Sequence, residues 1–185
     1  MKVINRKFPD QITLKTGDII LFAPHDFIGE CIAKIDKTPY SHVEVIIICW
    51  GIPMSAGSRI NGVNLFSIEK ALKGRFIEIK RIDDSFDSKN FSLKAAECFG
   101  KPYDFEGTFL NQLWYHITGK WTGKRGDSAK RALYCSEFVA LIYNKILGKN
   151  YFPEWWLTDP KTIYEDRRFK TIWKGQVDED NVKFL

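Results

Sequence analysis

The segment from Thr38 to Trp50, "TPYSHVEVIIICW", contains the strongest strand signal in the chain. Five of the six residues from Val43 to Ile48 are β-branched and apolar, and such a run is typical of a strand buried on both faces. His42 opens the run and Glu44 interrupts it. Alternate strand residues share a face, so we expect a strand over residues 42–49 that carries an imidazole and a carboxylate side by side.

Turn, strand and helix signals lie on both sides of this segment. "GDIILFA" (Gly17 to Ala23) predicts a turn and a buried strand, and apolar residues at helical spacing behind Asp26, as a capping residue, predict a short helix over 26–36. After the central strand, a weaker strand is expected near Met54. Asn61-Gly62 is a strong turn signal that precedes a further strand.

The second half of the chain is richer in helical patterns. The expected elements are a short helix over 68–74, a strand over 75–82, a helix capped by Ser88, a helix over 108–119, a helix over 134–147, and a short helix from Pro160 followed by a strand. Helices and strands are interspersed, and hairpin signals cluster in the middle third, so the predicted class is α+β.

Composition limits the possible classes of protein. The 185 residues suit a single domain, and 44% hydrophobic with 15% aromatic residues excludes a disordered chain. The net charge of +5 permits an anionic partner without requiring one. No signal-peptide pattern and no stretch of ~18 to 20 apolar residues is present, so we expect a cytoplasmic protein without a transmembrane segment.

The four cysteines are widely spaced, without a CxxC pair or a Cys/His cluster, so we expect free thiols, no metal site and no cofactor. A nucleophilic cysteine needs a lowered pKa and a base within reach. Cys135 fits best because it begins the strongest predicted helix, where unpaired amides and the helix dipole stabilise a thiolate. The other three fall inside apolar patterns and read as small buried hydrophobic residues: Cys31, Cys49 and Cys98.

The candidate base is one of three histidines. His25 lies in a predicted loop and His116 among aromatic residues, which favours solvated and packing roles. His42 comes with Glu44 on the same strand face, where a carboxylate can orient the ring or favour its protonated form. Two alternatives remain open from the residues alone: a structural histidine, and a glutamate that pairs with a buried Arg or Lys.

Together, "GDIILF", "SHVEVII", "YCSEFVALIY" and "DPKTIYEDRRF" resemble the permuted papain-like hydrolases, which are YiiX-like relatives of NlpC-type cell-wall peptidases and of lecithin retinol acyltransferase. The sequence of these segments is most similar to that of phage-encoded and bacterial members of this group. The histidine precedes the cysteine, as in the permuted order. The resemblance covers about residues 17–173 and implies one domain over 1–185, with a central antiparallel sheet or partial barrel packed against helices.

The resemblance implies that Cys135 is the nucleophile and His42 the base. Relatives often place a third polar residue, His or Glu, on the next strand, where this chain has Ser55. We therefore take Glu44 as the third member and Ser55 as its alternative. Tyr134 either lines the cleft or packs in the core.

The function implied is hydrolysis of an amide bond, in a peptide, an isopeptide or a peptidoglycan stem, through an acyl-enzyme. One alternative is a lipid-directed thioesterase or acyltransferase, for which "YFPEWWL" (151–157) offers a membrane-facing segment or, equally, an aromatic lid packed on the domain. Another is a binding module without catalysis. Its basic loop (120–131) lacks the interleaved aromatic residues of a nucleic-acid surface, so nucleic-acid binding is not expected. The oligomeric state is left open.

Overall fold

The computed structural model describes residues 12–105, 111–120, 122–123, 131–148 and 150–177. Over these ranges the chain forms a six-stranded antiparallel sheet in the order β4-β3-β2-β1-β5-β6. The strands are β1 (Ile19–Phe22), β2 (His42–Cys49), β3 (Ile52–Arg59), β4 (Gly62–Ser67), β5 (Phe76–Ile82) and β6 (Phe169–Gln176). The predicted α+β class is confirmed.

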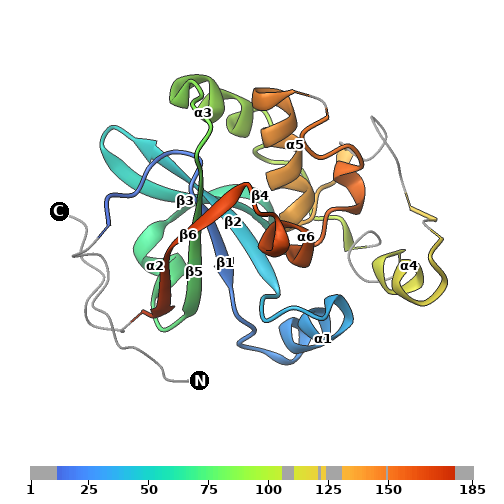
Figure 1. The fold of residues 1–185 in the computed structure, drawn as a ribbon. Helices are drawn as coiled ribbons and strands as arrows, with labels where there is room; N and C mark the ends of the chain where they lie inside the picture. Colours follow the sequence, from blue (N-terminus) through green and yellow to red (C-terminus); the bar gives the residue numbers. More distant parts are fainter. Residues whose placement is uncertain (1–11, 106–110, 121, 124–130, 149, 178–185) are drawn as a thin grey trace.

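Helices cover both faces of the sheet (Figure 1). They are α1 (Phe27–Asp36), α2 (Ile68–Leu72), α3 (Ser88–Ala96), α4 (Gln112–Thr118), α5 (Cys135–Leu147) and α6 (Pro160–Glu165), with a 3₁₀ turn, η3, at Trp155–Leu157. The larger core lies between the sheet and α3 and α5, and the smaller core lies under α2 on the other face. No helix in these ranges is both long and apolar enough to cross a bilayer.

Strand β2 is buried on both faces, as its sequence predicts. Val43, Val45 and Ile47 join the larger core with α5, whereas Ile46 points into the smaller core. Glu44 lies on the face of Ile46 and has no exposed surface. A buried carboxylate is costly unless it is paired and hydrogen-bonded, so the surroundings of Glu44 determine what this end of the sheet does.

Helix α5 begins at Cys135 because a hydrogen bond between Tyr134 and Glu137 caps its N-terminus. The amide of Tyr134 donates to Glu137 Oε2 over 3.1 Å, which places the Glu137 carboxylate at the positive end of the helix dipole. The buried residues that follow hold the helix against β2 and β3, and Phe138, Val139 and Ile142 have no exposed surface. The expected helix, its start and its apolar side are therefore confirmed.

Two details differ from, or decide between, the expectations. Asp87, and not Ser88, caps α3, because its carboxylate accepts a bond from the amide of Lys89 over 2.9 Å. The carboxylate caps the first turn, and the helix dipole stabilises its negative charge. The aromatic segment 151–157 packs on the domain: Phe152 and Trp155 are buried, and the Asn144 side chain bonds both the amide and the carbonyl of Phe152, over 2.6 and 2.7 Å.

Candidate functional site

Cys135 is the first residue of α5 and is 4% exposed. The helix start is fixed against β3, where Ser58 Oγ donates to the carbonyl of Leu133 over 2.5 Å. The first amides of a helix have no acceptor within it, so Cys135 lies where both the dipole and free N–H groups favour negative charge. The structure therefore gives the sulfur the location that the sequence predicts.

His42 lies at the start of β2, beside the Phe22 ring at 5.5 Å between centroids, and its side chain is 24% exposed. Burial alone lowers the pKa of the imidazole, but the charge and hydrogen-bonding capacity of Cys135, followed by those of Glu44, outweigh it and raise the pKa from 6.5 to about 9. The ring is therefore near both groups that the sequence analysis assigned to it. Neutral pH lies below this pKa, so the protonated imidazole prevails there.

The Glu44 carboxylate receives bonds from three side chains. Oε1 accepts from His42 Nε2 over 2.9 Å and from Arg59 Nε over 2.6 Å. Oε2 accepts from Arg59 Nη2 over 3.0 Å and from the Ser55 hydroxyl. Burial raises the pKa of this carboxyl, but His42 and then Arg59 reverse the effect and lower it to about 2. A buried anion is stable here because its lone pairs are occupied by donors.

Both readings of Glu44 from the sequence hold at once. It contacts the imidazole, and it pairs with an arginine, Arg59, whose side chain is 34% exposed and which the sequence analysis did not identify. The signal was present in the alternation of β3: Ser55, Gly57 and Arg59 share one face, and the register from Ile46–Ser55 places that face beside Glu44. Finding it required the register between β2 and β3, which is set at the Trp50-Gly51 turn and which the sequence analysis did not fix.

The two remaining predicted site residues have supporting positions. Ser55 is fully buried, and its bond goes to the Glu44 carboxylate and not to the imidazole. Tyr134 is 1% exposed, and its hydroxyl donates to the carbonyl of Thr158 over 3.0 Å. Of the two roles considered for Tyr134, packing is the one that this placement favours.

The other histidines and cysteines lie away from this cluster or outside the description. His25 is exposed beside Asp26, and the side chain of His116 lies outside the described part of the chain. All four cysteines are free thiols: Cys31 and Cys49 are half-buried, and burial raises the pKa of Cys98. Of the basic loop, Lys120 and Arg131 are described and exposed, whereas Lys124, Arg125 and Lys130 lie outside the described residues.

Asp18, in the "GD" pair near the start of β1, is held in a structural pairing. Its carboxylate accepts from Arg81 Nε over 2.6 Å, from Arg81 Nη2 over 2.7 Å and from the amide of Lys15 over 2.8 Å. The pair joins β5 to the turn before β1. It repeats the two-pronged geometry of Glu44 and Arg59 without a titratable base attached.

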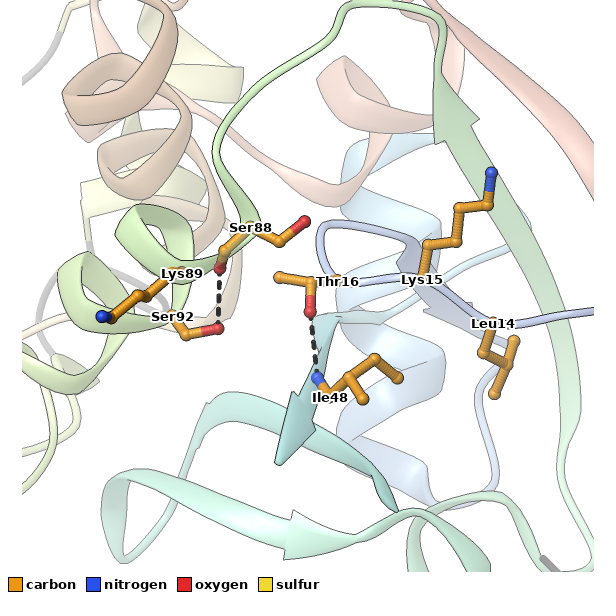
Figure 2. Close-up of a pocket in the computed structure, with 7 residues that line it drawn as sticks. All are labelled: Leu14, Lys15, Thr16, Ile48, Ser88, Lys89 and Ser92. Carbon is orange, nitrogen blue, oxygen red and sulfur yellow. Dashed lines mark hydrogen bonds between the residues drawn. The ribbon is translucent and has the colours of Figure 1, made fainter. Parts of the chain in front are cut away.

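A pocket of about 500 Å³ opens at the opposite end of β2, beside Ile48 (Figure 2). Six residues separate Ile48 from His42, which is roughly 20 Å along a strand. Thr16 there is engaged, because Oγ1 accepts from the Ile48 amide over 3.0 Å. Figure 2 shows the amino groups of Lys15 and Lys89 pointing away from each other. This pocket is therefore separate from the Cys135–His42 pair.

The donor set at the candidate site does not suit a metal ion. Glu44 bonds His42, and both of its oxygens already accept from the Arg59 guanidinium, so a metal ion on these oxygens would lie against a fixed positive charge. Within the residues that the structure describes, no group of three or more His, Cys, Asp or Glu side chains is arranged to hold a metal ion.

Comparison with known proteins gives a fold relationship. No family model matches the chain, and no curated protein is similar to it in sequence. Among solved structures, the crystal structure of the metalloprotein YiiX from Escherichia coli O157:H7 superposes with a TM-score of 0.66 at 16% sequence identity, over 87% of this chain and 97% of that one. The chain therefore has a YiiX-like α+β fold, as the resemblance in its motifs implied.

Proposed function

We propose that this protein is a cysteine-dependent hydrolase of amide bonds with a permuted papain-like arrangement, in which Cys135 is the nucleophile, His42 the acid–base and Glu44 the orienting residue. What supports the proposal is one observation above all: the imidazole of His42 interacts with both the sulfur at the start of α5 and a buried, ionised carboxylate. This proposed role accounts for two polar side chains, His42 and Glu44, on a strand that is otherwise apolar.

The reaction follows from these positions. Glu44 engages Nε2, so Nδ1 is the ring nitrogen left to exchange a proton with the sulfur. The Cys135 thiolate attacks the substrate carbonyl, and the amide of Cys135 at the helix start donates to the oxyanion that forms. The imidazolium gives its proton to the leaving amine as the C–N bond breaks, which leaves a thioester. His42 then takes a proton from water as the hydroxide attacks the thioester; the C–S bond breaks, the acid leaves, and the thiolate and imidazolium are restored.

The amide substrate is favoured over the lipid-directed alternative by where the aromatic segment 151–157 lies. The lipid-directed alternative relied on 151–157 as a membrane-facing segment, but Phe152 and Trp155 are buried in the larger core. The binding-module alternative, which relied on the basic loop, is separated from the hydrolase by the retention experiment described below. A peptide, an isopeptide or a peptidoglycan stem is the proposed substrate class.

An acyl-transfer experiment tests the proposal without knowledge of the substrate. The purified protein is incubated with 4-nitrophenyl acetate, nitrophenolate release is followed, and the acetylated residue is identified by peptide mass spectrometry. We expect a burst and a thioester on Cys135, both abolished in Cys135→Ser and strongly slowed in His42→Ala. Cys31→Ser, which changes a half-buried cysteine, is the matched control and should behave as the wild type. Acetylation of another residue, or a rate indifferent to His42, would overturn the proposal.

Fluorogenic peptide amides, ε-isopeptides and peptidoglycan stem peptides then separate the substrate classes. Turnover of a fatty-acyl thioester with none of these amides would instead establish the lipid-directed alternative. Salt-dependent retention on a phosphate matrix, with no turnover of any probe, would favour the binding module.

A further inference from the structure

Arg59 makes three distinct contacts around the carboxylate that holds His42. Its guanidinium bonds both oxygens of Glu44, over 2.6 and 3.0 Å, and stacks on the Phe66 ring with 3.9 Å between the guanidinium carbon and the ring centroid. A two-pronged pair restricts the carboxylate plane as well as its position. The aromatic ring below restricts the guanidinium in turn.

We propose that Arg59 is a positioning residue of the Cys135–His42 pair, which it aligns and keeps charged through Glu44. The inference rests on the proposed function, because it assigns Arg59 a role in the same site. It goes further by naming a residue on a different strand as a determinant of how the base operates.

The alignment argument follows from the shared oxygen. Glu44 Oε1 receives both Arg59 Nε and His42 Nε2, so the direction of the imidazole bond depends on where the guanidinium places that oxygen. Without Arg59, the carboxylate keeps the Ser55 hydroxyl and the imidazole as partners. Its plane is then free to turn, and the ring nitrogen facing the sulfur turns with it.

The absence of a side chain at Gly57 supports the same role. A Cβ at this position would lie 2.5 Å from Glu44 Cγ and 2.8 Å from Cδ and Oε1. The Glu44 side chain therefore occupies the space that a side chain at residue 57 would need. Gly57 lies between Ser55 and Arg59 on the same face of β3. Three alternate residues of one strand thus provide a donor, a space and a counter-ion for a single carboxylate.

The second argument concerns the charges of Glu44 and His42. Burial opposes ionisation of Glu44, and Arg59 is one of the two side chains that hold the pKa of its carboxyl down to about 2. If Arg59 is lost, that pKa rises, and the protonated carboxyl no longer favours the imidazolium. The pKa of the His42 imidazole then falls from about 9, so less of the imidazolium remains near neutral pH.

A matched pair of arginines separates positioning from general stability. Arg81 bonds both oxygens of the buried Asp18, and its side chain is 27% exposed compared with 34% for Arg59. Arg59→Met and Arg81→Met therefore each remove the cation of a two-pronged ion pair and leave a buried carboxylate without that counter-ion. Only the first carboxylate is attached to His42.

The experiment measures the rate constant for carbamidomethylation of Cys135 by iodoacetamide as a function of pH, together with urea unfolding, in wild type, Arg59→Met, Arg59→Lys and Arg81→Met. We expect similar losses of stability in the two Met variants. Only Arg59→Met should also lose rate near neutral pH, up to about tenfold for each unit by which the pKa of its imidazole falls. Arg59→Lys should recover part of the loss, because an ammonium restores the charge without the two-pronged geometry.

The outcomes distinguish this inference from the proposed function. If the Arg59 profiles superimpose on that of Arg81→Met while His42→Ala still slows the wild-type reaction, the positioning role is wrong and the hydrolase proposal stands. If the wild-type rate is indifferent to His42→Ala, the proposed function itself fails. Should Arg59→Met not fold, Arg59→Lys decides alone, since a profile identical to the wild type would overturn the inference.

Discussion

Gly57→Ala adds a single methyl group to the wall of the site, and its effect can be worked out from the structure. The new Cβ would lie 2.5 Å from Glu44 Cγ, whereas unstrained carbons approach to roughly 3.5 to 4.0 Å, so the carboxylate has to move by about 1 Å. Overpacking of this kind costs about 1 to 3 kcal/mol. No left-handed backbone conformation is involved at Gly57, so alanine would otherwise stabilise the protein by about 0.4 to 1 kcal/mol. Packing alone should therefore give a net loss of about 1 to 2 kcal/mol, to which weakening of the Glu44 bonds adds.

The functional loss should be larger than the loss of stability implies. A shift of about 1 Å stretches the 2.6 Å bond from Arg59 and the 2.9 Å bond from His42 beyond good hydrogen-bond length. Each such bond to a charged group is worth about 1.5 to 3 kcal/mol, so misalignment of His42 should slow labelling of Cys135 at least about tenfold.

Urea unfolding and iodoacetamide labelling of Cys135, both near neutral pH, measure the two effects. Gly51→Ala is the matched control: its backbone has φ of +81°, which alanine adopts only with strain, and no atom lies within 4 Å of the new Cβ. It should cost about 1 to 2 kcal/mol and leave labelling unchanged. If Gly57→Ala labels at the wild-type rate, or if the two variants slow labelling equally, the argument that the Glu44 cradle aligns His42 is refuted.

Three further predictions concern single residues. Glu44→Gln should slow turnover far more than Ser55→Ala, because the amide carries no charge to pair with the imidazolium; steady-state rates on any substrate found test this, and the reverse order would transfer the orienting role to Ser55. Burial, followed by the charge of Asp159, raises the pKa of Asp36 from 3.8 to about 7, so the folded protein keeps a proton that the unfolded chain has lost. The free energy of unfolding should therefore fall as pH rises from 3.8 to about 7. Asp36→Asn should flatten this pH range of a urea-unfolding series, and an unchanged slope would contradict the assignment. Tyr143→Phe removes a buried bond to the carbonyl of Gly17 and should cost about 1 kcal/mol in urea unfolding without slowing Cys135 labelling, whereas a slowed reaction would link this core bond to the site.

The sequence predicted the elements that depend on local signals. The central strand, the helix that starts at Cys135 and the helix that starts at Pro160 all appear with bounds close to those expected. The strand has a continuous β-branched run, and each helix has a residue that favours its start; these are short-range properties. The choice of Ser88 over Asp87 as a cap failed because both residues are good caps one position apart.

The site was predictable up to the point at which strand register matters. The pairing of His42 with Glu44 follows from alternation within one strand and is confirmed at 2.9 Å. Arg59 was missed because its role depends on which residue of β3 lies opposite Glu44, and a shift of one residue would have turned it to the other face. The proximity of Cys135 to His42 is a tertiary contact, which the sequence indicated only through the choice among three histidines and through the family resemblance.

The central claim is that His42 activates Cys135, and the most direct measurement is the pH dependence of Cys135 alkylation in wild type and His42→Ala, with Cys135→Ala identifying the labelled peptide. The pKa of about 9 for His42 keeps the imidazole protonated near neutral pH, so the labelling rate should change as pH rises through that value. His42→Ala should convert this profile into that of an ordinary thiol. Identical profiles in the two proteins, or faster labelling of Cys31 or Cys49 than of Cys135, would contradict the claim.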